Sequence, residues 1–450
     1  MTGRGTMTQD TIAAIATAPG EGGIGIIRLS GPEAERILAE VFRRPGKREA
    51  AWESHRMYYG FLQDGSETLD EGMAVLMRAP RSYTREDVAE IQLHGGAFVL
   101  HRGLELCLSR GARLAGAGEF TQRAFLNGRI DLSRAEAVMR MISARGEQEH
   151  RAAVRQLQGG VTAFVRDAAD RLYEIQAGLA ACVDYPEEIT EEEGAAEMIP
   201  RLEELIRLLR GAVQERTTRL LHQGLRVALV GRPNVGKSSL LNALLGEEKA
   251  IVTNIPGTTR DLVSGEMNLG GIRVQLTDTA GLRETEDAVE QIGVARSRKA
   301  MAETDVALLV LEGSEPLGEE DRQLLSEMPE NGAIVVNKND LPQRLELPET
   351  GRKVFFCSAM DPGTLEPLKE YLRSFTETAD RMAVTQPRHL DALKRAIAHL
   401  EAALETARTL PTDMAATDLQ AAQQALAEIT GDQADEKLLD KVFSTFCVGK

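Results

Sequence analysis

The segment Gly231–Ser238 (GRPNVGKS) lies between an apolar run, 227–230, and a helix-like pattern of leucines at positions 240, 241, 244 and 245. A strand, a loop of the form G-x-x-x-x-G-K-S and a helix, in this order, build a phosphate-binding loop. Its glycines let backbone N–H groups converge on phosphates, and the helix N-terminus adds a favourable dipole. Lys237 is expected to meet the charge of the β- and γ-phosphates, and the Ser238 hydroxyl to coordinate Mg²⁺. The motif predicts an α/β domain that binds a nucleotide.

Three more motifs follow in the order that builds a guanine-nucleotide site. Asp278-Thr279-Ala280-Gly281 ends an alternating strand, so that the aspartate can reach Mg²⁺ through water and the glycine N–H can meet the γ-phosphate. Asn337-Lys338-Asn339-Asp340 closes an apolar strand, and its aspartate can accept paired hydrogen bonds that guanine donates and adenine does not. Ser358-Ala359 follows a third strand and supplies a backbone N–H to guanine O6. Together the motifs predict a GTP site.

Length and cysteine usage limit the class of protein. With 450 residues, the chain is too long for one ordinary core, so about two to four domains are expected. Its four cysteines, Cys107, Cys182, Cys357 and Cys447, are scattered without a CxxC pair, which argues against disulfides and a zinc site. No apolar run approaches the roughly 18 residues that cross a bilayer. We expect a cytoplasmic protein with no membrane partner.

The charge balance restricts how a nucleic acid could bind. The formal net charge is −16, so a nucleic acid would have to be held by a local basic face rather than by the overall field. One candidate face lies in a helical region and comprises Arg123, Arg129, Arg134, Arg140, Arg145, Arg151 and Arg155. The same residues fit an ordinary solvated helix surface at least equally well.

Hydrophobic periodicity divides the chain into three domains. Residues 1–125 mix short strands with turns, as in an α+β domain. Residues 126–222 and 381–450 carry amphipathic stripes and form one discontinuous helical domain. Residues 223–380 hold the nucleotide motifs. The expected fold class is therefore multidomain, with an N-terminal α+β domain, an α-helical central domain and an α/β P-loop domain inserted into the helical one.

The ordered motifs, together with Thr253–Asp261 (TNIPGTTRD), resemble those of the MnmE (TrmE) family of tRNA-modification GTPases. The N-terminal segments Gly22–Arg28 (GGIGIIR), Glu90–Gly96 (EIQLHGG) and Gly118–Asn127 (GEFTQRAFLN) resemble that family too. The last four residues, Cys447-Val448-Gly449-Lys450, are similar to the family's C-x-G-K ending. The resemblance covers essentially the whole chain, and it implies a folate-binding-like N-terminal domain that dimerises.

For the nucleotide site, the resemblance implies a potassium ion beside the phosphates, where other GTPases use an arginine finger. Thr259 matches the switch threonine on Mg²⁺, although residues 253–259 by themselves would indicate only a polar loop. Leu282 stands where many GTPases place a water-orienting glutamine, and by resemblance Glu290 takes that role. Spacing alone would make Glu290 a helix-surface carboxylate.

The complete set of predicted site residues follows from the motifs and the resemblance together. The predicted nucleotide-binding residues are Asn234, Val235, Gly236, Lys237, Ser238, Ser239, Thr253, Asn254, Ile255, Pro256, Gly257, Thr258, Thr259, Asp278, Thr279, Ala280, Gly281, Asn337, Lys338, Asp340, Ser358 and Ala359. Lys237 and Glu290 are the predicted catalytic residues. The predicted Mg²⁺ ligands are Ser238 and Thr259, and the predicted K⁺ ligands are Asn234, Thr253, Ile255 and Thr258.

The resemblance also implies a second site that binds a tetrahydrofolate derivative, 5,10-methylene- or 5-formyl-tetrahydrofolate, as a one-carbon donor. Arg28 and Glu90 match the family's folate-site positions, and Lys450 matches a C-terminal contact. Arg129 stands where lysine is expected, which keeps the charge but changes the geometry. Cys447 fits either a chemical role or ordinary packing near the end of the last helix.

The function that the resemblance implies joins both sites. With an FAD-dependent subunit of the MnmG (GidA) type, a homodimer would add an aminomethyl-type (carboxymethylaminomethyl) group to C5 of the wobble uridine, U34, of certain tRNAs. Folate would supply the carbon, flavin the redox chemistry and GTP hydrolysis a conformational drive. A ribosome-assembly or signalling GTPase without modification activity is the alternative, and the folate-like region argues against it. A standalone folate-dependent aminomethyl transferase would leave the GTP site unexplained.

Overall fold

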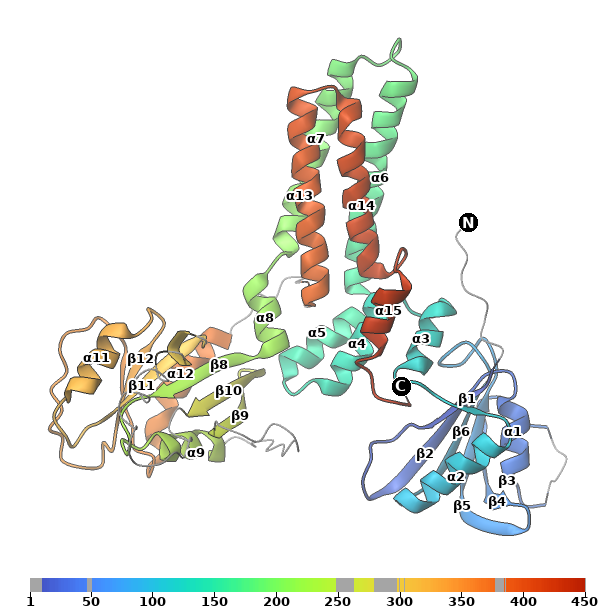
Figure 1. The fold of residues 1–450 in the computed structure, drawn as a ribbon, viewed down its shortest axis with the longest axis horizontal. Helices are drawn as coiled ribbons and strands as arrows, with labels where there is room; N and C mark the ends of the chain where they lie inside the picture. Colours follow the sequence, from blue (N-terminus) through green and yellow to red (C-terminus); the bar gives the residue numbers. More distant parts are fainter. Residues whose placement is uncertain are drawn as a thin grey trace. The chain divides into compact units, whose positions relative to one another are not determined.

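The computed structural model describes residues 10–46, 51–247, 263–278, 298, 300–302, 304–376, 384 and 386–449 (Figure 1). The chain divides into two compact units. The first unit consists of Met1–Met139, Gln156–Leu202 and Ala398–Lys450, and the second consists of Arg140–Arg155 and Glu203–Ile397. A separate β-sheet lies in each unit.

The sheet of the first unit contains, among the described residues, seven strands in the order β3-β4-β5-β6-β2-β1-β7. The strands are β1 (Ile12–Ile15), β2 (Gly22–Ser30), β3 (Phe42–Arg43), β4 (Met57–Asp64), β5 (Glu67–Met77), β6 (Val88–Gly95) and β7 (Arg113–Leu114). Helices α1 (Ala34–Val41) and α2 (Ala97–Ser109) pack with one face, where Ile27, Leu62 and Ile91 are fully buried. Alternate residues of a strand point to opposite faces, so each strand contributes every second side chain to this core.

The opposite face of this sheet carries exposed apolar side chains. Ile24 of β2 is 65% exposed, and Met57 and Tyr59 of β4 are 42% and 50% exposed. The register Tyr59↔Met73↔Gln92↔Ile26 aligns β4, β5, β6 and β2 across this face. Among the described residues, this face of the sheet therefore exposes several apolar side chains.

Long helices accompany the sheet of the first unit. In this unit α6 (Gly160–Asp184) and α14 (Ala416–Thr430) pack side by side (Figure 1). The division between the two units falls within α7 (Glu191–Ala212) and α13 (Pro387–Thr409). Val165, Leu172 and Ile175 of α6 are buried at helical spacing, as an amphipathic stripe requires. The shorter helices are α3 (Glu119–Leu126), α4 (Leu132–Ser143) and α15 (Glu436–Phe443). After α15 the C-terminal tail reaches the segment before α3, where Val448 forms an antiparallel bridge with Ala117.

The sheet of the second unit contains, within the described ranges, six strands in the order β13-β12-β11-β8-β10-β9. They are β8 (Leu225–Val230), β9 (Val263–Leu269), β10 (Ile272–Asp278), β11 (Val306–Glu312), β12 (Ala333–Asn337) and β13 (Val354–Phe356). The strands run parallel except for the edge strand β9. Continuous apolar runs such as 306–311 are buried along their length, as expected for parallel strands covered on both faces.

The helices of the second unit are α5 (Glu147–Leu157), α8 (Glu215–Gln223), α9 (Lys237–Glu247), α11 (Glu319–Glu327) and α12 (Glu366–Thr376). The expected multidomain combination of an α+β sheet, helices and an α/β P-loop sheet is confirmed. The three domain boundaries and the folate-binding likeness stay predictions. Among the helices that the structure describes, none combines the length and apolarity needed to cross a membrane.

Candidate functional site

The phosphate-binding loop lies where the sequence predicts it, between β8 and α9. Lys237 begins α9, and only 4% of this residue is exposed. Its Nζ donates hydrogen bonds to the backbone oxygens of Gly231 (2.7 Å) and Arg232 (2.6 Å). Burial lowers the pKa of the Lys237 ammonium, because desolvation disfavours the charged form. A buried ammonium that donates hydrogen bonds to loop carbonyls is a ready partner for an anionic phosphate.

Backbone geometry makes this loop intolerant of side chains at Gly236. Its φ is +93°, and a Cβ there would lie 2.3 Å from Nδ2 of Asn337. The same Nδ2 donates a hydrogen bond of 2.9 Å to the backbone oxygen of Val235. Asn337 thereby ties the end of β12 to the phosphate-binding loop. Its Oδ1 is buried and has no hydrogen-bond partner among the described residues.

Two oxygen atoms of the predicted magnesium site are close together. Ser238 Oγ donates a hydrogen bond of 2.5 Å to Asp278 Oδ2. Asp278 ends β10, which pairs with β8 in parallel, so both motifs reach the same edge of the sheet. Asp278 is fully buried. The arrangement offers hard oxygen atoms of the kind that Mg²⁺ prefers.

The predicted guanine-recognition motifs also meet. Ser358 Oγ donates a hydrogen bond of 2.6 Å to Asp340 Oδ1, and this bond lowers the pKa of the Asp340 carboxyl. Lys338 has a φ of +59°, and its Nζ lies 2.7 Å from Glu312 Oε2. A carboxylate kept ionised in this way can accept two hydrogen bonds from guanine.

The structure therefore brings together the described members of the predicted nucleotide site. Several predicted residues lie outside the described residues: Thr253, Asn254, Ile255, Pro256, Gly257, Thr258, Thr259, Thr279, Ala280, Gly281, Glu290 and Lys450. Their roles stay predictions. Ser239 is exposed on α9, and Val235 is buried in the core beneath the loop.

Sequence reasoning missed an ion pair that connects the phosphate-binding loop to α11. Arg232 Nε lies 2.8 Å from Asp321 Oδ2, and Asp321 is 1% exposed. Asp321 Oδ2 also accepts a hydrogen bond of 3.0 Å from the backbone N–H of Gly318, just before α11. No spacing signal joins Arg232 to an aspartate almost ninety residues later, so only the fold reveals the pair.

The residues predicted for folate binding meet in the first unit. Arg28 of β2 pairs with Glu90 of β6 in the sheet register, and Arg28 Nε lies 2.8 Å from Glu90 Oε1. Arg28 Nη1 donates a hydrogen bond of 3.3 Å to the backbone oxygen of Gly449. Arg129 Nη1 donates one of 3.1 Å to the backbone oxygen of Tyr83. Two strands, the segment after α3 and the C-terminal tail thus build one charged site.

Tyr83, which the sequence did not single out, links the arginines of this site. Its ring centroid lies 5.6 Å from Arg28 Cζ and 4.7 Å from Arg129 Cζ, within the range of a cation–π contact. Its hydroxyl shares a hydrogen bond of 2.9 Å with Thr121 Oγ1. Tyr83 lies in the loop between β5 and β6, where no periodic pattern in the sequence marks it as a site residue.

The seven arginines proposed as a basic face do not form one open surface. Arg123 is 3% exposed, and its guanidinium contacts Asp10, Glu86 and Glu119. Arg145 is paired with Glu266. The prediction of a shared face is wrong for these two residues, because residue type fixes a charge but not the partner that neutralises it.

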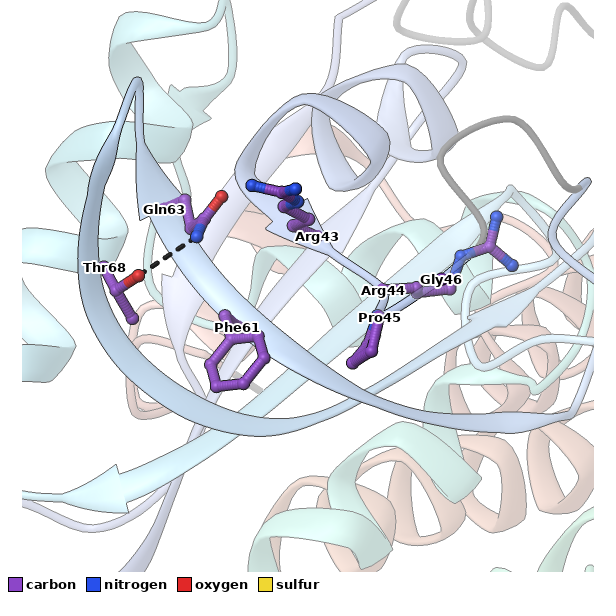
Figure 2. Close-up of a pocket in the computed structure, with 7 residues that line it drawn as sticks. All are labelled: Arg43, Arg44, Pro45, Gly46, Phe61, Gln63 and Thr68. Carbon is purple, nitrogen blue, oxygen red and sulfur yellow. Dashed lines mark hydrogen bonds between the residues drawn. The ribbon is translucent and has the colours of Figure 1, made fainter.

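A pocket of about 460 Å³ lies at the β3–β4–β5 edge of the first sheet (Figure 2). Figure 2 shows Phe61 and the hydrogen-bonded pair Gln63–Thr68 on its strand side, with Arg43 and Arg44 on the other. None of the predicted site residues lines it. The candidate sites are therefore defined by the converging motif residues rather than by this cavity.

Comparison with known proteins shows the family of this chain. The family model for the GTP-binding protein TrmE N-terminus matches residues 11–129, and the model for the MnmE helical domain matches residues 132–447. A tRNA modification GTPase MnmE from Heliobacterium modesticaldum is 44% identical over 99% of this chain and 100% of that protein. One from Symbiobacterium thermophilum is 46% identical over the same shares of the two chains. Since the matches span both units, the chain belongs to the MnmE family of tRNA modification GTPases.

Proposed function

We propose that this protein hydrolyses GTP to drive a modification at C5 of the wobble uridine, U34, of certain tRNAs. The added group is of the aminomethyl type (carboxymethylaminomethyl), with a tetrahydrofolate derivative as carbon donor and an FAD-dependent MnmG-type subunit as partner. The observation that carries the proposal is that one chain contains two sites, each built from predicted residues that lie close together. One is the phosphate and guanine site around Lys237 and Asp340, and the other is the charged site around Arg28 and Glu90.

In the GTP site each described residue has a distinct task. The Lys237 ammonium exchanges the carbonyls of Gly231 and Arg232 for phosphate oxygens. Asp340 accepts hydrogen bonds from the guanine edge, and Lys338 stays fixed beside it through Glu312. Glu290, outside the described residues, is proposed to orient the attacking water.

The oxygen donors present fit the two metal ions. Ser238 Oγ and the buried Asp278 carboxylate suit Mg²⁺, and Thr259 is proposed as a further ligand. Asn234 is exposed on the loop with a φ of +65°, and its amide oxygen is a suitable K⁺ ligand. Thr253, Ile255 and Thr258 are proposed to complete the K⁺ site. Bound metal ions neutralise negative charge on the phosphates.

The charged site in the first unit fits a folate. A guanidinium can donate to a glutamyl carboxylate, and a carboxylate can accept from the pteridine amide edge. The side chains of Arg28 and Glu90 are 15% and 17% exposed, so they are largely desolvated and still accessible. We assign Arg129 and Lys450 to the same ligand. A folate supplies a one-carbon unit when bound.

The exposed apolar side chains of the first sheet support the proposal of a homodimer. Ile24, Met57 and Tyr59 lie on that face, and a second copy of the chain would bury them. Such a contact is isologous, because each copy presents the same strands.

Reconstitution tests the proposed function. The purified chain, the flavoprotein subunit, unmodified tRNA, methylene-tetrahydrofolate, GTP and an ammonium or glycine donor are combined, and tRNA nucleosides are analysed by mass spectrometry. A product at U34 that requires every component supports the proposal. GTP hydrolysis without any C5 product would instead favour the ribosome-assembly or signalling GTPase.

The cation dependence is measured separately, as hydrolysis in KCl and NaCl at equal ionic strength. The proposed mechanism requires a faster rate in KCl, and that increase should disappear in Asn234→Ala. A rate indifferent to the cation would remove potassium from the proposal while leaving the GTPase in place.

A further inference from the structure

The β9–β10 hairpin is held at its turn by the start of α5. Gly270 and Gly271 form a two-residue turn with φ of +59° and +79°, as in the tight hairpins that match strand twist. The backbone N–H of Gln148 donates a hydrogen bond of 3.0 Å to the Gly271 oxygen. Gln148 Nε2 donates one of 2.5 Å to the Gly270 oxygen. The start of α5 thus binds the backbone oxygens of the turn.

Side chains extend this contact along β9. Asn268 Nδ2 donates a hydrogen bond of 3.1 Å to the Arg145 oxygen, and the Arg145 guanidinium forms an ion pair with Glu266. A Cβ at Gly146 would lie 2.4 Å from the Gly271 oxygen, so the two backbones are in close approach. We call this set of contacts the hairpin clamp, formed by Arg145, Gly146 and Gln148 with Glu266, Asn268, Gly270 and Gly271.

The strand that leaves the clamp ends in the GTP site. β10 runs from Ile272, buried against Ala152 and Leu221, to Asp278, which contacts Ser238. Between them Val274 and Leu276 are fully buried, and the strand pairs with β8 from Val274 to Asp278. β9 begins at Val263, four residues after Thr259. A rigid, packed strand therefore joins the clamp to the predicted metal site.

The chain on the other side of the clamp leads toward the folate-site residues. α4 is one continuous helix that ends at Ser143, two residues before Arg145, and the division between the two units falls within it. At its start Leu132 and Ala135 are buried with Phe443 and Phe446. The tail that follows Phe446 carries Gly449, whose oxygen accepts a hydrogen bond from Arg28.

We infer that the hairpin clamp couples the nucleotide state of the GTP site to tRNA modification, with Arg145 as a positioning residue. The inference rests on the proposed function. The Arg145 and Glu266 side chains are 29% and 28% exposed, so their ion pair contributes little to folding stability. Its role is instead to fix which residues of the hairpin contact the start of α5. Coupling between sites is reciprocal, so a contact that shifts with nucleotide state also biases that state.

The test measures GTP hydrolysed and U34 product formed in the reconstituted reaction. Arg145→Ala and Glu266→Ala should hydrolyse GTP at close to the normal rate while product per GTP falls about tenfold, a usual size for coupling between sites. Arg145→Lys, which keeps a positive charge beside Glu266, should retain much of that yield. Gln148→Ala, which removes one bond to the turn, gives a second variant if an ion-pair variant fails to fold.

Arg151→Ala is the matched control. Arg151 lies on α5, and its side chain and that of its partner Glu147 are exposed at 69% and 67%. This variant should keep the normal product per GTP. Normal yield in both Arg145→Ala and Glu266→Ala, or a loss in Arg145→Lys as large as in Arg145→Ala, would overturn the inference. If the unaltered protein makes no product, the proposed function itself is wrong, and this result differs from a failure of the clamp inference, in which the unaltered protein still makes product.

Discussion

The two candidate sites are built in different ways. The GTP site uses main-chain groups and short contiguous motifs at the ends of parallel strands, such as the loop carbonyls that hold Lys237. The N-terminal site uses side chains on an antiparallel sheet and a tail. Arg28 and Gly449, which contact one another, are 421 residues apart in the chain.

This difference predicts how each site responds to substitution. A site made of backbone groups depends on glycine conformation and on a few motif side chains, so one change can abolish it. A site made of several charged side chains loses affinity in steps, because each contact contributes separately. The following variants test that contrast, from the largest expected effect to the smallest.

Asp340→Asn should cause the largest loss. Replacing one carboxylate oxygen with an amide nitrogen places a donor against the donors of guanine, and GTP affinity should fall about thousandfold. The variant also alters the bond that Asp340 Oδ1 accepts from Ser358. Titration with a fluorescent GTP analogue measures the loss. Folate binding serves as the control and should be unchanged; near-normal GTP affinity would show that guanine is recognised elsewhere.

Gly236→Ala should weaken GTP binding about a hundredfold. The new Cβ would lie 2.3 Å from Asn337 Nδ2, and the φ of +93° is strained for alanine. Backbone strain of this kind costs about 3 kcal/mol at most, which corresponds to about a hundredfold in affinity.

Gly246→Ala is the matched control for that variant. Gly246 lies on α9, the helix that begins directly after Gly236, and a Cβ there meets no atom within 4 Å in the described part of the chain. Alanine should stabilise the helix slightly and leave GTP affinity unchanged. Equal losses in both variants would mean that α9, rather than the loop, is sensitive to change.

Sequence reasoning reached the GTP site because its parts are contiguous. Lys237, Asp278 and Asp340 each lie in a recognisable motif at or just after the end of a strand, and parallel strands bring such ends to one edge of the sheet. The edge strand β9 (Val263–Leu269) was not predicted, because its sequence VSGEMNL lacks the β-branched enrichment of a strand.

Contacts between distant residues were beyond sequence reasoning. The resemblance placed Arg28 and Glu90 in one site, but nothing in the sequence pointed to Tyr83 between two arginines. The Arg232–Asp321 pair and the burial of Arg123 have the same explanation. Charge is visible in a sequence, whereas the partner that compensates it depends on the fold.

Arg28→Lys should lower folate affinity about tenfold and leave GTP hydrolysis unchanged. Lysine keeps the charge but loses the planar fork that contacts Glu90 and the tail together. Calorimetric titration with 5-formyl-tetrahydrofolate measures the change. Arg102→Lys, at an exposed ion pair on α2, is the control. A full loss of GTP hydrolysis in Arg28→Lys would contradict the separation of the two sites.

Tyr83→Leu should have the smallest effect, a loss of folate affinity of about threefold. Each cation–π contact contributes about 0.5–1 kcal/mol at a partly exposed site, and leucine removes the ring beside Arg28 and Arg129 while keeping an apolar side chain. Tyr83→Phe keeps the ring and loses only the bond to Thr121, so its affinity should stay close to normal. If Tyr83→Phe loses as much affinity as Tyr83→Leu, the hydroxyl rather than the ring orders the site. If neither Tyr83 variant changes folate affinity, the two arginines hold their positions without the Tyr83 ring. The N-terminal site would then depend less on side-chain packing than the contrast with the GTP site implies.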